Sequence, residues 1–302
     1  MFGSERLMLI ASSSLDRTPA FDRAAALAKA KDATLHIVAF DFVEGLATAG
    51  MVHEKALWQM REAYLQRHRD WLEEQAVTLR QTGVSVTVEA AWARLPLDEI
   101  MVHIRELNPS LVIKDLAHES WLTRALFTSL DLRLLHECAV PLHLVSRVVH
   151  AMPRKVLVAV DAFRLEDQFE DFNATIILAA EKLAAQCDAQ LHLLYVHDFS
   201  SVLAGQGEIA FGLSTTESVY DAQEAAFDAL ADRFGVPRER RHFLTGTPAR
   251  KIVAFAESQA IDVIVMGTVH RDHLTNLLGR TTEHVAYHMP CSLLAINPRQ
   301  PG

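Results

Sequence analysis

An internal repeat constrains this chain more than any other feature of its sequence. Residues 6–12 (RLMLIAS) align with 155–161 (KVLVAVD), and the segment that begins at Pro96 aligns with the one that begins at Pro248. The run 111–114 is aligned with 264–267 in the same way. A chain that repeats itself at this length builds one structural unit twice. At 302 residues it is also long enough for two domains.

Two domains are therefore predicted, at 1–148 and 152–302, joined by a short linker near 146–153. Each copy alternates short apolar runs, typical of strands covered on both faces, with segments of helical periodicity. Leu65, Leu72 and Leu79, for example, recur every seven residues and indicate a buried helical face. The predicted strands are 7–11, 34–40, 85–90, 110–114 and 142–146 in the first copy, and 155–160, 190–196, 240–244, 261–266 and 292–296 in the second.

This alternation predicts an α/β fold in which each domain is a doubly wound parallel sheet flanked by helices. The stretch 261–297 shows the pattern most clearly. An apolar run ends at Gly267, a polar segment leads to Gly279, a helical segment carries residues 283–288, and a second apolar run follows. In a parallel sheet, the loop that leaves a strand toward a helix is a natural place for a phosphate.

The same stretch resembles the universal stress protein family, whose ATP-binding members carry a Gly, two residues, Gly, nine residues, Gly-Ser/Thr pattern at this junction. Gly267 begins the pattern, but His270 stands where the second glycine belongs, and Arg280 follows Gly279 where Ser or Thr is usual. The loop is also one residue short. The resemblance covers nearly the whole chain and implies five-stranded sheets of order 3-2-1-4-5 in an adenine nucleotide alpha hydrolase-like fold.

The resemblance also implies a nucleotide site in the second domain only. Asp161 would lie near the base and ribose, and Gly246, in the Gly-x-Pro motif, would permit close approach of the ligand. The remaining cofactor-binding candidates are Val196, Gly267, His270, Gly279, Arg280, Thr281 and Thr282. ATP, with Mg²⁺, is the expected ligand if the altered loop still binds one. Asp161, Thr281 and Thr282 could equally serve as helix caps.

The first copy lacks these features. It has Ser12 in place of Asp161, and Arg94-Leu95-Pro96 in place of the Gly-x-Pro motif. After its fourth strand it has no glycine, with Lys114 expected opposite Gly267. A phosphate nest is hard to form without glycine, so the first domain is predicted to have lost the nucleotide site.

The family implies a pairing of domains as well. Universal stress domains commonly dimerise through their last strands, so the edges that end near Val145 and Ile296 are expected to pair within this chain. An unpaired apolar edge would otherwise invite association. A further homodimer is left open.

Composition limits the partners. The net charge of −9 and pI near 5.9 argue against a nucleic-acid ligand, which needs a basic surface. No apolar stretch is long enough for a membrane span, and the start does not resemble a signal peptide, so a cytoplasmic protein is expected. Three scattered cysteines suggest reduced thiols and no thiolate metal site.

Catalytic motifs are not found: there is no nucleophile elbow, P-loop Lys-Ser/Thr or HExxH sequence. His270, His273 and His197 could be proposed as metal ligands, but 15 scattered histidines make chance neighbours common, and no metal is predicted. The segments 41–54 and 197–216 follow the second strands and could cover a pocket for an apolar ligand.

Three functions remain open on this basis. The first is a non-enzymatic binding and signalling protein of the stress response, with adenine nucleotide in the second domain. The second is a weak Mg-ATP hydrolysing or phosphoryl-transferring protein, for which the sequence offers no clear base. The third is a carrier of an apolar ligand.

Overall fold

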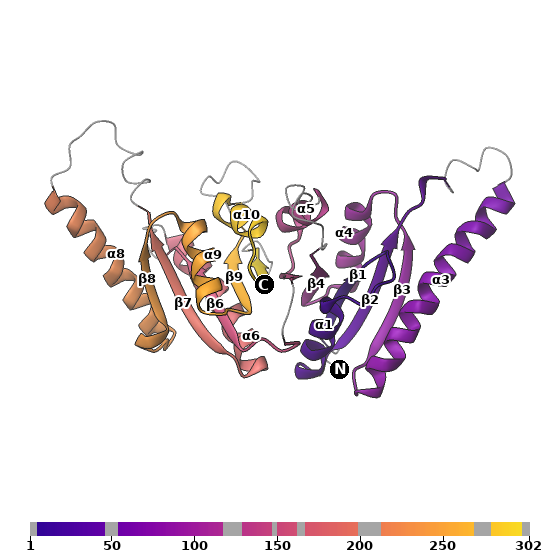
Figure 1. Ribbon diagram of the computed structural model, residues 1–302, viewed down its shortest axis with the longest axis horizontal. Coiled ribbons are helices and arrows are strands. Elements are labelled where there is room, and N and C mark those ends of the chain that lie inside the picture. Colours follow the sequence, from indigo (N-terminus) through magenta and orange to yellow (C-terminus); the bar gives the residue numbers. More distant parts are fainter. Residues whose placement is uncertain are drawn as a thin grey trace. The chain divides into compact units, whose positions relative to one another are not determined.

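The structure is a computed structural model, and it describes residues 5–45, 54–116, 129–146, 150–161, 167–198, 213–268 and 279–297. The chain forms two compact units, Met1–Met152 and Pro153–Gly302 (Figure 1). They are called the first and the second unit below. No helix among the described residues is long and apolar enough to cross a membrane.

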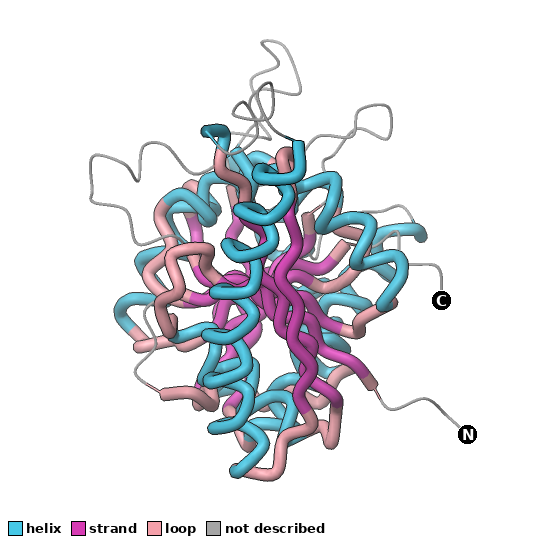
Figure 2. Tube along the Cα trace, turned by 90° about the vertical axis from the view of Figure 1, so that its right-hand side faces the viewer, coloured by secondary structure: helices cyan, strands magenta, loops and turns pink. Residues whose placement is uncertain are grey.

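In the first unit, five parallel strands lie in the order β3-β2-β1-β4-β5. The strands are β1 (Arg6–Ala11), β2 (Thr34–Asp41), β3 (Val86–Trp92), β4 (Leu111–Asp115) and β5 (Leu142–Val145). The helices are α1 (Pro19–Ala30), α3 (Glu54–Gln81), α4 (Pro96–Leu107) and α5 (Ser129–Glu137). Figure 2 views this unit with the long α3 helix in front of the strands.

In the second unit, the strands lie in the equivalent order, β8-β7-β6-β9-β10. They are β6 (Lys155–Val160), β7 (Gln190–His197), β8 (Arg241–Thr245), β9 (Val263–Gly267) and β10 (Ser292–Ile296). The helices are α6 (Asp167–Cys187), α8 (Leu213–Arg233), α9 (Pro248–Ser258) and α10 (Arg280–Tyr287), with a short 3₁₀ helix η2 (Arg238–Arg240) before β8. The predicted fold class and strand order are thus confirmed in each unit.

Both faces of each sheet are covered, which explains why the strands are continuous apolar runs. In the first unit α1 contacts α3 through an edge-to-face pair of Phe21 and Trp71, while α4 contacts α5 across the sheet's other face. Leu7, Met8 and Leu9 of the central strand are fully buried between these layers. The predicted stripe Leu65, Leu72 and Leu79 is buried under α3.

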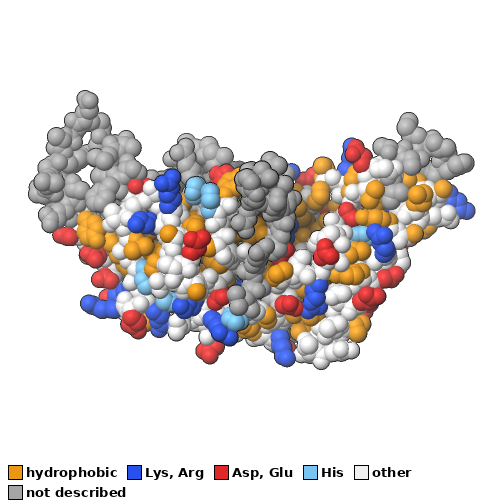
Figure 3. Space-filling model, in the orientation of Figure 1, with side chains coloured by type: hydrophobic (Ala, Val, Ile, Leu, Met, Phe, Trp, Pro, Cys, Tyr) orange, Lys and Arg blue, Asp and Glu red, His pale blue; other side chains and the backbone are white. Residues whose placement is uncertain are grey.

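Proline marks the start of the helices that follow β3 and β8. Pro96 and Pro248 each occupy the first turn, where the missing N–H costs no hydrogen bond. The two helices end differently, with Asn108 and Ala260 at equivalent positions, both in the left-handed region at φ 44° and φ 50°. On the face shown in Figure 3, acidic and basic side chains are interspersed, without an extended basic area among the described residues.

Candidate functional site

The predicted ligand residues of the second unit lie at the carboxyl ends of its strands. Asp161 follows β6, Val196 and His197 end β7, Gly246 follows β8, and Gly267 ends β9. Because the strands are parallel, all of these positions share one edge of the sheet. The start of α10, with Gly279, Thr281 and Thr282, belongs to the connection that leaves this edge from β9.

Asp161 is fixed through its backbone. The side chain of Asn173, which is buried on α6, accepts a hydrogen bond from the Asp161 N–H at 3.2 Å and donates one to the Asp161 carbonyl at 2.8 Å. This pair of bonds ties the end of β6 to the helix that follows it. The direction in which the chain leaves the strand is therefore set by Asn173, a residue that the sequence did not single out.

Gly246 adopts a backbone conformation that requires glycine. Its φ of +139° is rarely adopted by residues with a side chain, and a Cβ there would come within 2.8 Å of the Lys251 side chain. The Gly246 N–H donates to the His197 carbonyl at 2.9 Å, so the turn between β8 and α9 is attached to the end of β7. The family resemblance implied a glycine at this position, and the positive φ accounts for it.

Gly267 serves packing. A Cβ on this residue would lie 2.0 Å from Cζ of Phe172 and 3.0 Å from Cδ1 of Ile176, both on α6. The Thr282 hydroxyl donates to the Gly267 carbonyl at 2.7 Å, and Thr282 is almost fully buried. This hydroxyl therefore connects α10 to the end of β9 and has no further hydrogen to donate.

The other candidates occupy less defined positions. Gly279 precedes α10 at φ −60°, a value open to any residue, and its N–H reaches the Thr268 carbonyl at 3.4 Å. Thr281 is half-buried in the first turn of α10, and Val196 is buried on β7. Arg280 begins α10, but its side chain is not described, and His270 lies outside the described residues.

A buried polar group that sequence reasoning missed lies beside this edge. The Gln223 carbonyl oxygen on α8 accepts hydrogen bonds from the Tyr195 hydroxyl, at 2.9 Å, and from Nδ1–H of His197. His197 is 1% exposed, so the ring is enclosed by protein and held in one tautomer. Only the spacing of Tyr195 and His197 on alternate strand positions could have suggested that both face the same helix.

The first unit differs at the two positions that matter for phosphate. The sheet pairs Asp115 with Val145 at the end of β4 and Gly267 with Ile296 at the end of β9. Asp115 therefore corresponds to Gly267, which corrects the alignment that put Lys114 there by one residue. The register explains the shift, because the equivalent residues Leu7 and Val156 are paired with Leu111 and Val263, so Leu111 corresponds to Val263 and not to Ile264.

Asp131 is the second difference. Among the described side chains of α5, Asp131 is the first that is buried, with 2% of its surface exposed. Thr282, 3% exposed, is the first buried side chain described in α10, so the two positions correspond. Lys114 Nζ lies 2.8 Å from Asp131 Oδ1, and both side chains are largely buried. Burial raises the pKa of Asp115 to about 7, with Lys114 opposing the rise and Asp131 adding to it. Two carboxylates thus occupy the places of a glycine and a threonine.

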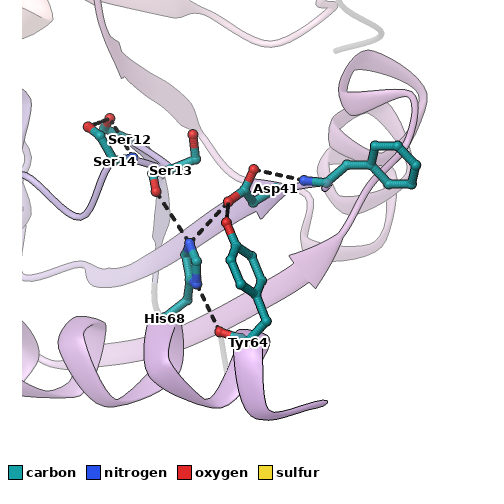
Figure 4. Close-up of polar contacts among 7 residues, drawn as sticks. Ser12, Ser13, Ser14, Asp41, Tyr64 and His68 are labelled. Carbon is teal, nitrogen blue, oxygen red and sulfur yellow. Dashed lines mark hydrogen bonds and ion pairs between the residues drawn. The ribbon is translucent and has the colours of Figure 1, made fainter. Parts of the chain in front are cut away.

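The first unit also has a polar cluster at the ends of β1 and β2 (Figure 4). The Tyr64 hydroxyl donates to Asp41 Oδ2, and His68 Nε2 lies 3.2 Å from the same oxygen. His68 Nε2 is also 3.3 Å from the Ser13 carbonyl, and its Nδ1 is 3.0 Å from the Tyr64 carbonyl. Burial and the bond to Asp41 raise the pKa of Tyr64 to about 12.

This cluster is a hydrogen-bonded polar network and not a nucleophilic triad. A triad needs a serine hydroxyl on one ring nitrogen and a carboxylate on the other. Here the carboxylate of Asp41 and the Ser13 carbonyl share Nε2 of His68, while the hydroxyls of Ser12 and Ser14 bond to each other at 2.6 Å. Nδ1 of His68 faces the Tyr64 carbonyl, so no serine hydroxyl contacts either ring nitrogen.

Within the part of the chain that the structure describes, no group of three or more His, Cys, Asp or Glu side chains could hold a metal ion. His197 and its neighbour Asp198 therefore form no such group there, and His270 and His273 are not described. The two segments proposed as covers for an apolar pocket, 41–54 and 197–216, lie mostly outside the described residues.

Comparison with known proteins gives a consistent result. The family model for the universal stress protein family matches this chain twice, over residues 4–146 and 152–297. Universal stress protein E of Escherichia coli (strain K12) is 27% identical over 244 residues, which cover 80% of this chain and 77% of that protein. Universal stress protein E of Photorhabdus laumondii is 23% identical over 304 residues, covering 99% and 96%.

Solved structures show the same fold. A Pseudomonas aeruginosa UCBPP-PA14 structure described as a universal stress protein aligns with a TM-score of 0.76 at 22% identity, covering 98% of this chain and 94% of that one. A universal stress protein from Archaeoglobus fulgidus DSM 4304 aligns with a TM-score of 0.66 at 18% identity, covering 96% of both chains. Both cover the two units together.

Proposed function

Because this chain belongs to the universal stress protein family in both of its halves, we propose that it is a non-enzymatic binding protein of the stress response whose second unit takes an adenine nucleotide. The proposal places the protein in the cytoplasm, where ATP is abundant. It assigns no catalytic residue. Occupancy of the second unit, rather than turnover, would be the signal.

One observation carries the choice of unit. The first unit has Asp115 at the carboxyl end of β4 and Asp131 in the first turn of α5. The second unit has Gly267 and Thr282 at these two positions. Phosphate brings negative charge. Lys114 offsets the charge of Asp131, so the repulsion comes from Asp115, whose carboxylate is charged above its pKa of about 7 and lies where little water is present to screen it. The second unit has neutral groups at these two positions, which favours an anionic ligand there.

The residues of the second unit fit a nucleotide in kind. The Asp161 carboxylate could accept hydrogen bonds from ribose hydroxyls, and Gly246 lets backbone approach a ligand without a side chain in between. Gly279, Arg280 and Thr281 would face phosphate at the start of α10, where the helix dipole favours negative charge. Mg²⁺ would accompany the triphosphate, supplying charge neutralisation.

Isothermal titration of ligand-stripped protein with ATP, with and without Mg²⁺, tests the proposal. We expect one site per chain, lost in Gly279→Trp, which fills the space at the start of α10, and weakened at least tenfold in Asp161→Ala. Ser12→Ala changes the equivalent position of the first unit and should leave the affinity unchanged. Absence of heat at concentrations that detect micromolar affinity would contradict nucleotide binding.

Two further readouts separate the alternatives. Phosphate release from Mg-ATP that is lost in Gly279→Trp would favour the hydrolysing or phosphoryl-transferring protein. A lipid-like molecule recovered from organic extracts of purified protein, together with no ATP binding, would favour the carrier. Neither result is expected.

A further inference from the structure

The two units have four equivalent positions where α4 and α9 pack near the edge strands β3 and β8, with different side chains. The equivalence follows from the register, since Val38 is paired with Glu89 and Leu194 with His242. It also follows from the matching proline starts of the two helices. The four positions are His36, Thr87, Glu89 and His103 in the first unit, and His192, Arg240, His242 and Phe255 in the second.

In the second unit, these positions bring two imidazoles together. His192 Nδ1 and His242 Nε2 are 3.1 Å apart, and the rings stack with centroids 5.3 Å apart at an angle of 16°. Phe255 of α9 covers His242 with ring centroids 4.4 Å apart. The other ring nitrogen of His192, Nε2, is buried and has no hydrogen-bond partner among the described residues.

This contact does not favour added protons. The bond between His192 and His242 needs one nitrogen with hydrogen and one without. A single imidazolium can still donate to a neutral partner, but protonation of both rings leaves two donors facing each other, and a protonated His192 carries an Nε2–H with no acceptor among the described residues. Proton uptake therefore weakens the contact that this pair adds to the backbone pairing of β7 and β8.

The surrounding charges oppose protonation as well. Lys155 of β6 and Arg240 of η2 act on His192, and α9 contributes the apolar ring of Phe255. Arg241, also on β8, is engaged with Asp228 and Asp232 of α8. No carboxylate forms an ion pair with His192 or His242 among the residues that the structure describes. Burial first, then His242, Lys155 and Arg240, lower the pKa of His192 to about 4, and burial lowers that of His242.

The first unit supplies a carboxylate at the corresponding place. Glu89 Oε2 lies 3.5 Å from His36 Nε2, and Glu89 Oε1 lies 3.3 Å from His103 Nε2. The His36 Nδ1 bonds to the Thr87 hydroxyl at 2.9 Å, where the second unit has Arg240. Burial lowers the pKa of His36, while Glu89 opposes that shift. A protonated His36 thus has a carboxylate partner, which His192 lacks among the described residues.

We propose that β8 is an acid-releasable edge of the second unit, opened when the His192–His242 pair takes up protons, while β3 of the first unit, where Glu89 offers His36 a partner, is released less readily. Each sheet order ends at one of these strands, so neither is held on its other side within its unit (Figure 1). Release of β8 would also withdraw Gly246, whose N–H bonds to His197 at the end of β7. The inference does not depend on the proposed function.

The size of the effect follows from proton linkage. A histidine freed by opening titrates near its ordinary pKa of about 6.5, while His192 in the closed sheet does so near 4. Between these two pKa values, lowering the pH by one unit raises the ratio of open to closed state by up to about tenfold for one ring. We therefore expect the open population of β8 to rise about 15-fold between pH 6.5 and pH 5.

Hydrogen exchange measured by mass spectrometry on the full chain at pH 7, 6 and 5, with rates corrected for the intrinsic pH dependence, tests this. Protection of β8 should fall by about 20-fold between pH 7 and pH 5, whereas protection of β3 should change by less than about threefold. Equal changes in both strands would overturn the proposal.

Matched variants exchange the residues at the equivalent positions 89 and 242 between the two units. His242→Glu places the first unit's carboxylate in the second and should remove the acid sensitivity of β8. Glu89→His should confer it on β3. His242→Phe removes the second titrating ring without adding charge and should at least halve the pH slope; an unchanged slope contradicts the proposal. Should a variant fail to fold, an NMR titration of the wild-type histidines decides, because a His192 ring that titrates at pH 6 or above overturns it.

Discussion

Asp115 is the residue at which the two units differ most in charge. Its carboxyl is buried at the end of β4 and accepts a hydrogen bond from the Ala20 N–H at the start of α1. In the folded first unit its pKa is about 7, above the unfolded value of 3.8. Between these values the folded state binds more protons, so this group weakens folding progressively as pH rises from about 4 to 7.

Asp115→Asn should therefore stabilise the first unit at alkaline pH. The amide oxygen keeps the bond from Ala20, and the buried charge is gone. We expect a gain of about 1 to 3 kcal/mol at pH 8, shrinking to nearly nothing near pH 4. Urea unfolding followed by tryptophan fluorescence at the two pH values measures it. A gain that is equal at both would show that charge is not the cause.

Residues that meet only through the fold were beyond sequence reasoning. His192 and His242 become neighbours because β7 and β8 pair in one register, and a shift by one residue would put His242 on the opposite sheet face. The Asp41–His68 contact likewise depends on how α3 is rotated over the sheet. Asp161 and Gly246 could be predicted because they follow apolar runs in recognisable motifs.

At the scale of elements, α9 ends less favourably than its counterpart α4. Ala260 adopts φ +50°, in the left-handed region, where a residue with a Cβ but no polar side chain is strained. The equivalent Asn108, at φ +44°, is of a residue type that adopts this conformation at lower cost. At this helix end the second unit therefore carries backbone strain that the first does not.

Ala260→Asn should raise the free energy of unfolding of the second unit by about 0.5 to 1 kcal/mol, since asparagine adopts the left-handed region at lower cost. Denaturant unfolding followed by circular dichroism measures the change. The reciprocal variant, Asn108→Ala, should lower the stability of the first unit by a similar amount. If both substitutions were neutral, the left-handed conformation would not be costly at either helix end.

The strands of this fold were predictable because buried parallel strands are continuous apolar runs. Their limits were less so: the run from Ile261 to Met266 is apolar except at Asp262, yet β9 starts only at Val263. Asp262 instead uses its carboxylate to accept hydrogen bonds from the N–H groups of Arg154 and Lys155, at the start of β6. That polar contact, which follows from tertiary structure, set the boundary.

At the scale of the whole molecule, the two units can be observed separately. All four tryptophans, Trp58, Trp71, Trp92 and Trp121, are in the first half of the chain, whereas circular dichroism reports helices of both. A ligand that binds one unit stabilises that unit by mass action, by about 2.7 kcal/mol at a hundred times its Kd.

Saturating Mg-ATP should therefore shift part of the urea transition seen by circular dichroism and leave the tryptophan transition in place. Gly279→Trp would add a reporter to the second unit, so Gly279→Leu is the suitable control, with neither transition shifted. A tryptophan transition that moves together with the circular dichroism signal would show that the units unfold as one, or that the first unit holds the ligand. Pairing of the last strands of the two units stays a prediction.

The shared register of the two sheets has a genetic consequence. Helix α4 with strand β4, and helix α9 with strand β9, follow equivalent strands, begin at equivalent prolines and reach the strand end after the same number of residues. The coding sequence therefore holds two interchangeable segments. Replacement of residues 96–115 by 248–267 would bring Gly267 in for Asp115 in a single recombination event, with the register to the central strand kept. Such a chain could change the charge of one half by exchange with the other.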